Sequence, residues 1–176
     1  MMHSARFLVG AALAGMLTFG AATAYADHHT VKLSGTRFEM QVPKDWAPGY
    51  RDLDNNLLML YFKNADGAAL EGVYRRKVEP ASYTLADFKA WRIGAEGKRY
   101  EGKDHKVAKD EAVTIGGEKG NYLMTTWNEG SVPWEKHTAQ YLKDGRQYMV
   151  VLSGPQGKLN KKVFDEAVAS FALGKE

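Results

Sequence analysis

Three residues near the start of the chain have the types and order that bind copper or nickel. Asp27, His28 and His29 follow Ala24-Tyr25-Ala26, the small-residue pattern at which signal peptides are cleaved. If Asp27 is the mature N-terminus, its amine, two deprotonated backbone nitrogens and the His29 imidazole form a square plane that suits Cu(II) or Ni(II). The other interpretation is a hydrophilic terminus without metal. We expect no cofactor, and Cu or Ni binding by these three residues is the alternative.

A second group of chemically capable residues lies between Trp134 and Tyr141. Glu135 and His137 are two residues apart, so on a strand they point to the same face and could orient one another or share a metal. Trp134 follows Pro133, and we expect it to be partly exposed. Aromatic side chains are favoured in pockets and interfaces. We predict a ligand- or partner-binding surface at Trp134, Glu135, His137 and Tyr141; the alternative is a surface Glu–His pair beside packed aromatic residues.

The other motifs that suggest chemistry are incomplete. The run GGEKG at residues 116–120 lacks the order of a phosphate loop and precedes a strand-like segment, so it is interpreted as a hairpin turn. Ser131 and Ser153 have no G-x-S-x-G context. The chain contains no cysteine, which excludes thiol nucleophiles, disulfides and a lipidated cysteine. We expect a protein that is not an enzyme, with a hydrolase as a third possibility.

Residues 1–26 have the order of a secretory signal peptide. One Arg precedes an apolar run from Phe7 to about Phe19, and Ala24-Tyr25-Ala26 ends the segment. The run is shorter than the roughly 20 apolar residues of a membrane-spanning helix. We therefore expect cleavage after Ala26 and an exported protein, periplasmic or secreted, that has no membrane anchor. Residues 27–176 have the usual size of one domain.

Charge patterning gives no indication of a nucleic-acid partner. The formal net charge is +3 at pH 7, and the charged residues are dispersed along the chain. The densest basic run, Arg75-Arg76-Lys77, is short. Nucleic-acid and polybasic membrane sites need larger blocks of positive charge. We expect a protein partner or a small ligand instead.

Most of the elements that must position these residues are strands. Phe38, Met40 and Val42 alternate with polar residues, and residues 57–62 form a short apolar run. Residues 113–155 are typical of four strands broken by GGEKG, NEGSVP and KDGR, and Asp144-Gly145 has the composition of a type I′ hairpin turn. We predict a polar loop over residues 49–56. The segment 134–143 is more polar than its neighbours, so we expect it to lie nearer solvent.

Two helices interrupt this series of strands. Thr84 is placed to cap the first, with Asp87 near its N-terminus, and Gly94 and Gly97 predict an end before Tyr100. The second is capped by Asn160 and has one apolar stripe: Phe164, Ala167, Val168 and Phe171. The fold class is therefore α+β, with antiparallel β-meanders on which helices pack.

The order of motifs resembles that of the PsbP/Mog1-like group of α/β/α sandwich proteins, which includes exported bacterial members. The features are the strand F-x-M-x-V-P-K-D-W at residues 38–46, a mid-chain helix, Ile115-Gly116-Gly117-x-x-Gly120, and a terminal helix that ends Ala169-Ser170-Phe171. For most members the resemblance implies an accessory or binding role in photosystem assembly, small-GTPase nucleotide release or the cell envelope. It implies no shared catalytic motif. We expect an exported, non-enzymatic binding or accessory protein of the envelope, with the metal-binding role as the alternative.

Overall fold

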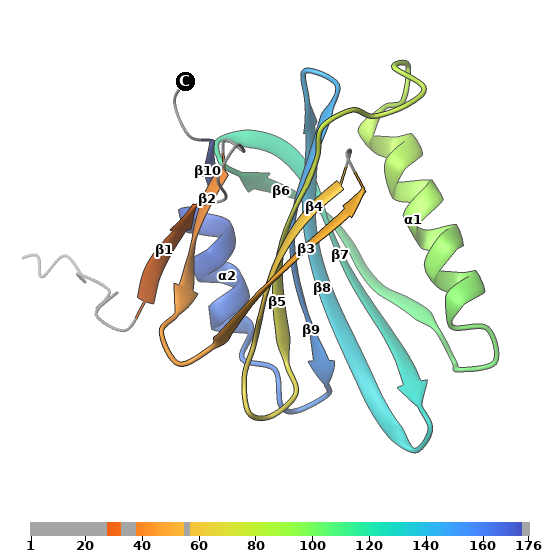
Figure 1. Ribbon diagram of the computed structural model, residues 1–176. Helices are drawn as coiled ribbons and strands as arrows, with labels where there is room; N and C mark the ends of the chain where they lie inside the picture. The colour runs from red at the N-terminus through yellow and green to blue at the C-terminus, as the bar shows by residue number, and fades with distance from the viewer. Residues whose placement is uncertain (1–27, 33–37, 55–56, 174–176) are drawn as a thin grey trace, which may run out of the picture.

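A seven-stranded antiparallel sheet forms the centre of the molecule, with one helix on each face (Figure 1). The computed structural model describes residues 28–32, 38–54 and 57–173. The strands of this sheet are β3 (Ala47–Asp54), β4 (Leu57–Lys63), β5 (Ala69–Arg75), β6 (Lys106–Ile115), β7 (Glu118–Glu129), β8 (Val132–Lys143) and β9 (Arg146–Pro155). A small sheet contains β1 (His28–Lys32), β2 (Phe38–Pro43) and β10 (Ala172–Leu173). The helices are α1 (Leu85–Arg99) and α2 (Lys161–Ser170).

The large sheet consists of two meanders joined edge to edge. Its strand order is β3-β4-β5-β9-β8-β7-β6, and β5 pairs with β9 in a register that places Tyr74 opposite Tyr148. Because β6 lies at the far edge from β3, the chain that leaves β5 must cross the sheet before it pairs again. That crossing contains α1. The topology therefore places α1 over one face of the sheet.

Two-residue turns close two of the hairpins in the second meander. Gly116 and Gly117 have φ values of 58° and 79°, and Asp144 and Gly145 have 51° and 68°. Type I′ turns require positive φ at both central residues, which glycine adopts without steric cost and Asp tolerates. The predicted four-strand meander is confirmed, and so is the interpretation of GGEKG as a turn.

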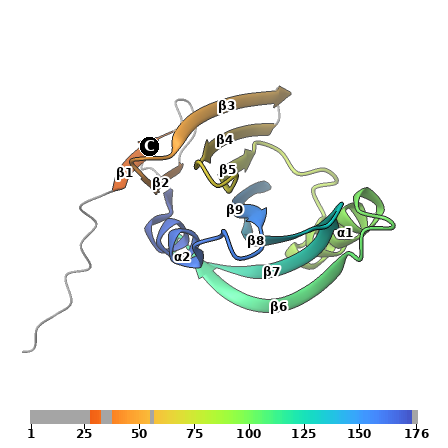
Figure 2. The same cartoon turned by 90° about the horizontal axis from the view of Figure 1, so that it is seen from below.

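Both helices begin at the predicted caps and lie on opposite faces of the sheet (Figure 2). The Thr84 hydroxyl accepts from the Asp87 backbone N–H at 3.2 Å, and the Asp87 carboxylate accepts from the Thr84 backbone N–H at 2.8 Å. This reciprocal arrangement is a capping box. The Asn160 side chain accepts from the Lys162 backbone N–H at 3.1 Å. Tyr100 caps the C-terminus of α1, as the glycines predicted.

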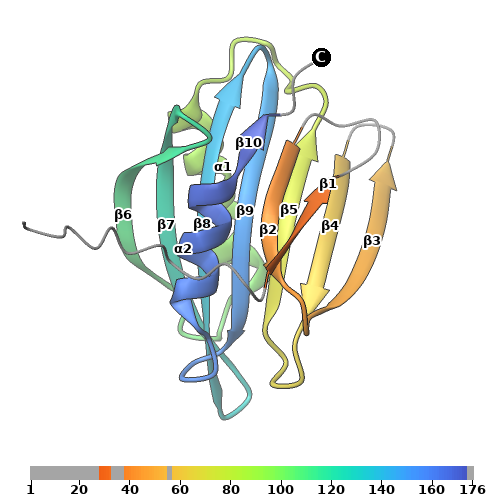
Figure 3. The ribbon, with the colours of Figure 1, turned by 90° about the vertical axis from the view of Figure 1, so that its left-hand side faces the viewer.

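The main core lies between the sheet and the layer formed by α2 and the small sheet (Figure 3). A ladder of aromatic rings crosses three strands there: Tyr148 lies 5.2 Å from Tyr74 and 4.9 Å from Tyr141 between ring centroids. Phe171 meets Tyr141 edge-on at 6.1 Å. Trp46 is 6 % exposed and belongs to the same core.

Two predictions about the strands are wrong. Residues 47–54, of which 49–54 were expected as loop, form the edge strand β3 paired with β4. Pro48 and Gly49 suggested a turn, but an edge strand tolerates Pro, and Gly49 leaves space for the Tyr61 ring opposite. The segment 134–143 is not near solvent, because β8 is central and its residues from His137 to Tyr141 are buried. Its polar side chains form hydrogen bonds with one another and with neighbouring strands, and these bonds offset the cost of removing polar groups from water.

The N-terminal predictions lie outside the described residues. These are the signal peptide over residues 1–26 and the position of Asp27. Among the residues that the structure does describe, neither helix has the length and apolar character needed to cross a membrane.

Candidate binding cleft

A cleft lies between α1 and the face of the sheet that the helix crosses. A cavity of about 270 Å³ extends under α1, and a wider one of about 710 Å³ continues from it beyond the helix C-terminus. The two share five lining residues: Met59, Glu71, Arg99, Lys136 and Val151. Together they have the size of a small-molecule site.

The floor of the narrow part is apolar. Val73, Met149 and Val151, on β5 and β9, are 2 %, 6 % and 3 % exposed and form a cluster with Leu57 and Met59 of β4. This cluster is separate from the main core, because alternate residues on these strands face opposite sides of the sheet. On the rim, Trp91 of α1 is 52 % exposed. The cleft thus offers apolar surface beside solvent.

A buried carboxylate, that of Glu96, occupies the helix side of the cleft. Glu96 is 7 % exposed, and its Oε1 lies 2.5 Å from Lys136 Nζ and 3.5 Å from an Arg92 guanidinium nitrogen. The Thr125 hydroxyl donates to Oε2 at 3.0 Å. Burial acts to raise the pKa of Glu96, but Lys136, Arg92 and Thr125 outweigh it and hold this pKa below the ordinary value. The carboxylate therefore stays ionised near neutral pH.

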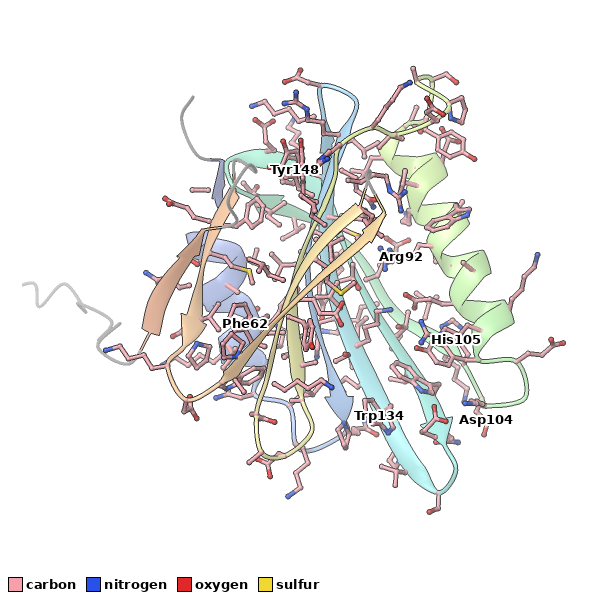
Figure 4. All side chains as sticks on the ribbon, viewed as in Figure 1. Phe62, Arg92, Asp104, His105, Trp134 and Tyr148 are labelled. Atoms are coloured by element: carbon pink, nitrogen blue, oxygen red, sulfur yellow. The ribbon has the colours of Figure 1, made fainter. Side chains whose placement is uncertain are left out.

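The two cations that face Glu96 are themselves desolvated. The side chains of Arg92 and Lys136 are only 13 % and 15 % exposed. Burial lowers the pKa of each, and Glu96 acts in the opposite sense. Figure 4 shows Arg92 between α1 and the strands, with His105 near the C-terminal end of the helix.

A row of hydrogen-bonded polar side chains orients two arginines, Arg75 and Arg92, that line the narrow part of the cleft. Arg75 Nε donates to Gln147 Oε1 at 3.4 Å, Gln147 Nε2 donates to Gln140 Oε1 at 3.1 Å, and Gln140 Nε2 donates to Asn121 Oδ1 at 3.0 Å. Arg92 Nε also donates to Gln140 Oε1, at 3.3 Å. The two glutamines are fully buried. Each arginine is therefore oriented by a neutral amide. The terminal nitrogens of Arg92 contact Glu96 and the Met149 sulfur, whereas Arg75 forms no ion pair with a described carboxylate and keeps N–H groups for other acceptors.

A stack of rings lines the wide part of the cleft. Tyr100 lies between His105 and Trp127, at 5.8 Å and 4.3 Å between centroids, and Trp127 is stacked on Trp134 at 5.9 Å. Trp134, at the end of the stack, is half-buried, as the sequence predicted. Of the predicted binding residues, it is the one that lines this cleft.

The structure separates Trp134 from the three residues that were grouped with it. Glu135, His137 and Tyr141 point to the opposite face of β8, where His137 is 2 % and Tyr141 0 % exposed. The predicted Glu–His contact exists, with His137 Nε2 2.7 Å from Glu135 Oε1. The Tyr122 hydroxyl lies 2.7 Å from His137 Nδ1. The pair is therefore part of a buried network rather than a surface pair, and it does not face Trp134.

The predicted metal site lies only partly within the described residues. His28 and His29 lie in β1, where they pair with Pro43 and Val42, but Asp27 is outside the described residues. In the described ranges, no three His, Asp or Glu side chains are grouped as metal ligands.

The cleft residues on α1 were not identified from the sequence, although they carried a signal. Arg92, Glu96 and Arg99 fall at i, i+4 and i+7, which places them on one face of a helix. That face is charged, and charged helix faces usually meet solvent, so the spacing alone did not indicate a site. On β8, Lys136, Thr138 and Gln140 alternate with the residues of the opposite face, a second signal that the polarity of the segment obscured.

The architecture defines the chain as a protein with the PsbP-like α+β fold, which confirms the fold expected from the resemblance. Cyanobacterial PsbP from Synechocystis sp. superimposes with a TM-score of 0.64 at 15 % identity, over 90 % of this chain and 99 % of that one. A protein of unknown function from Pseudomonas aeruginosa gives 0.52 at 15 % identity, over 80 % and 92 %. A Bacteroides thetaiotaomicron protein gives 0.52 at 18 % identity, over 79 % of this chain but 46 % of that longer one. No protein-family model and no curated protein matches the sequence.

Proposed function

We propose that this chain is an exported, non-enzymatic accessory protein that binds a small ligand in the cleft between α1 and the sheet. One observation carries the proposal: the apolar cluster of Val73, Met149 and Val151 lines a cavity of about 270 Å³ between α1 and the sheet. Concave, largely apolar sites with a few oriented polar groups are typical of ligand pockets. A protein partner would more often use a flatter surface, so the cleft favours a small ligand.

Two further features support the accessory role. Residues 1–26 have the pattern of a signal peptide, and most members of the PsbP/Mog1-like group serve as accessory or binding proteins. The Glu135–His137 pair is buried beneath α2 on the other face of the sheet, away from the cleft. It therefore has no direct access to a molecule bound there.

The binding proposal is tested with Nile red, an uncharged dye that fluoresces in apolar surroundings. We expect enhanced fluorescence with the mature protein and loss of the enhancement in Ala95→Trp, because Ala95 lines the narrow cavity and a Trp there fills it. Ala90→Trp is the matched control: Ala90 is exposed on α1 and is not among the lining residues. Equal enhancement in all three proteins would contradict the cleft as the site.

The proposal that the protein is not an enzyme is tested separately. We expect no turnover of p-nitrophenyl esters above the rate of buffer. Hydrolysis that His137→Ala abolishes would show that the chain is an enzyme.

A further inference from the structure

The charge of the cleft points to a class of ligand, and this inference rests on the proposed function. We propose that the ligand is an amphipathic carboxylic acid, with its acid group beside Arg99 and Lys136 and its unbranched apolar chain under α1. The proposal depends on the balance of charges in the cleft, on how these charges are paired, and on the chemistry of the floor.

The lining residues carry an excess of positive charge. Five cationic side chains border the two parts of the cleft, against three carboxylates: Arg75, Arg92, Arg99, Lys103 and Lys136, against Glu71, Glu96 and Glu129. A cleft lined by an excess of one sign of charge attracts ligands of the other, and low-dielectric walls strengthen the effect. An anion is therefore favoured over a neutral or cationic ligand of the same shape.

Among the described residues, three of these cations are held in ion pairs with lining carboxylates and two are not, and of those two Arg99 is the one that lines both parts of the cleft. Glu96 is shared by Arg92 and Lys136, and Glu129 lies 2.7 Å from Lys103. By contrast, Arg75 and Arg99 form no ion pair with a carboxylate in the described part of the chain. Arg75 bonds to an amide, and Arg99 lies over the Tyr100 ring at 5.6 Å. A planar guanidinium can donate two parallel hydrogen bonds to a carboxylate.

The position of Arg99 sets the orientation of the ligand. Arg99, Lys136 and Glu71 line both parts of the cleft, so they lie where the narrow part opens into the wide one. The two cations outnumber the carboxylate at this junction. The narrow part continues from this junction over the apolar floor. An acid group at the junction would keep contact with solvent through the wide part, while an attached chain would cover Met59, Val73 and Met149.

The floor favours an unbranched chain over a rigid ring system. Two of its side chains are methionines, Met59 and Met149, whose flexible thioethers adapt to the shape of a bound group. The narrow volume of about 270 Å³ is just below the usual range of ligand pockets, so it suits a slender group better than a bulky one. The exposed Trp91 ring lies on the rim and would cover the apolar end of such a chain.

Three probes with the same chain and different head groups test the inference: decanoate, decanol and decyltrimethylammonium. Each is titrated into the mature protein at neutral pH, below its micelle concentration, by calorimetry. We expect decanoate to bind at least about tenfold more tightly than the other two. The Arg99→Gln variant should lose about tenfold in affinity for decanoate and keep its affinity for decanol. Lys98→Gln is the matched control, since Lys98 is exposed on α1 and outside the lining.

The outcomes separate this inference from the proposed function. Equal binding of all three probes, or equal effects of Arg99→Gln and Lys98→Gln, would overturn the anionic class and leave the cleft as a small-ligand site. If none of the three probes binds, but Nile red still binds the mature protein and not the Ala95→Trp variant, the inference alone is overturned. If none of the three probes binds and Nile red gives no response, both the inference and the proposed small-ligand site are overturned, and a protein partner is favoured.

Discussion

Lys136 of β8 and Glu96 of α1 meet inside the cleft, with 2.5 Å between Nζ and Oε1. This contact joins the central part of the sheet to the helix that crosses it. Both side chains are nearly buried, so a well-packed apolar pair could be as stable, whereas removal of one partner leaves an uncompensated charge. The ion pair therefore acts chiefly to hold α1 in one position over the sheet and to keep charged groups in the cleft.

The Glu96→Gln substitution should lower the free energy of unfolding at neutral pH by about 3 kcal/mol. The reason is that the buried Lys136 ammonium then lacks its closest carboxylate. Urea denaturation measures this loss. The double substitution Glu96→Gln/Lys136→Met should recover part of it, since it removes both charges. A double variant less stable than Glu96→Gln would show that Lys136 has another stabilising role.

Acid should remove the contribution of the ionised Glu96 side chain to the stability of the folded protein. Its pKa is lower in the folded protein than in the unfolded chain, so the folded state binds fewer protons and the stabilisation is complete above the ordinary Glu value of 4.5. It is lost as the pH falls below 4.5 through the folded pKa. The melting temperature of the wild type should therefore fall more between neutral pH and about pH 3 than that of Glu96→Gln. A Glu101→Gln variant, altered at an exposed carboxylate, should follow the wild type; equal slopes for all three would contradict the assignment.

The buried network beneath α2 should be sensitive to the loss of one hydroxyl. An ionised Glu135 can only accept, so His137 Nε2 donates to it, and Nδ1 accepts from the Tyr122 hydroxyl. Tyr122→Phe leaves Nδ1 buried without its donor, and the free energy of unfolding should fall by about 1 to 3 kcal/mol. Tyr83→Phe, at an exposed ring, should change it little. Equal effects would show that the Tyr122–His137 bond contributes no stability.

The same tyrosine predicts a response to alkali. Burial, with the charges of Asp165, Glu111 and Glu135, raises the pKa of Tyr122 to about 12. Because the folded state holds this proton more tightly than the unfolded chain, stability should fall as the pH rises from about 10 towards 12. Melting curves across this range should show a smaller fall in Tyr122→Phe than in the wild type. A parallel fall in both would assign the effect to the other buried tyrosines.

The glycines of α1 offer a gain in stability. A Cβ at Gly94 or Gly97 meets no atom within 4 Å, and Gly inside a helix costs about 0.5–1 kcal/mol relative to Ala. Each Gly→Ala change should therefore raise the free energy of unfolding by about that amount, as measured in urea. Gly117→Ala is the contrasting control, because φ there is +79° and an added Cβ is strained. A loss of stability in the α1 variants would indicate that α1 needs flexibility in its last turns.

Copper binding at the N-terminus stays a prediction with a direct measurement. Protein whose first residue is verified as Asp27 should bind Cu(II) one-to-one with the visible spectrum of a square-planar site, and His29→Ala should lose that spectrum. The pairing of His29 with Val42 in β1 would compete for the same backbone segment. Equal weak binding by both proteins would remove this alternative.

The sequence alone determined the turns and helix caps, because these depend only on residues close together in the chain. Type I′ turns need glycine or a permissive residue at fixed positions, and helix caps need a side-chain oxygen two or three residues before a free N–H. Asp144-Gly145, Thr84 and Asn160 were therefore identified correctly. The alternation of residues also placed Glu135 and His137 on one face. Strand β3 was missed because pairing with β4, rather than any local preference, makes it a strand.

The tertiary structure alone decided which face of each strand meets α1. Strand order depends on contacts between residues far apart in the chain, and the crossing from β5 to β6 places α1 over Lys136 rather than over His137. A charged helix face therefore became the wall of a cleft, and a polar strand became the centre of the sheet. Trp134 and His137, near neighbours in the sequence, were separated because successive side chains of a strand point to opposite sides of the sheet.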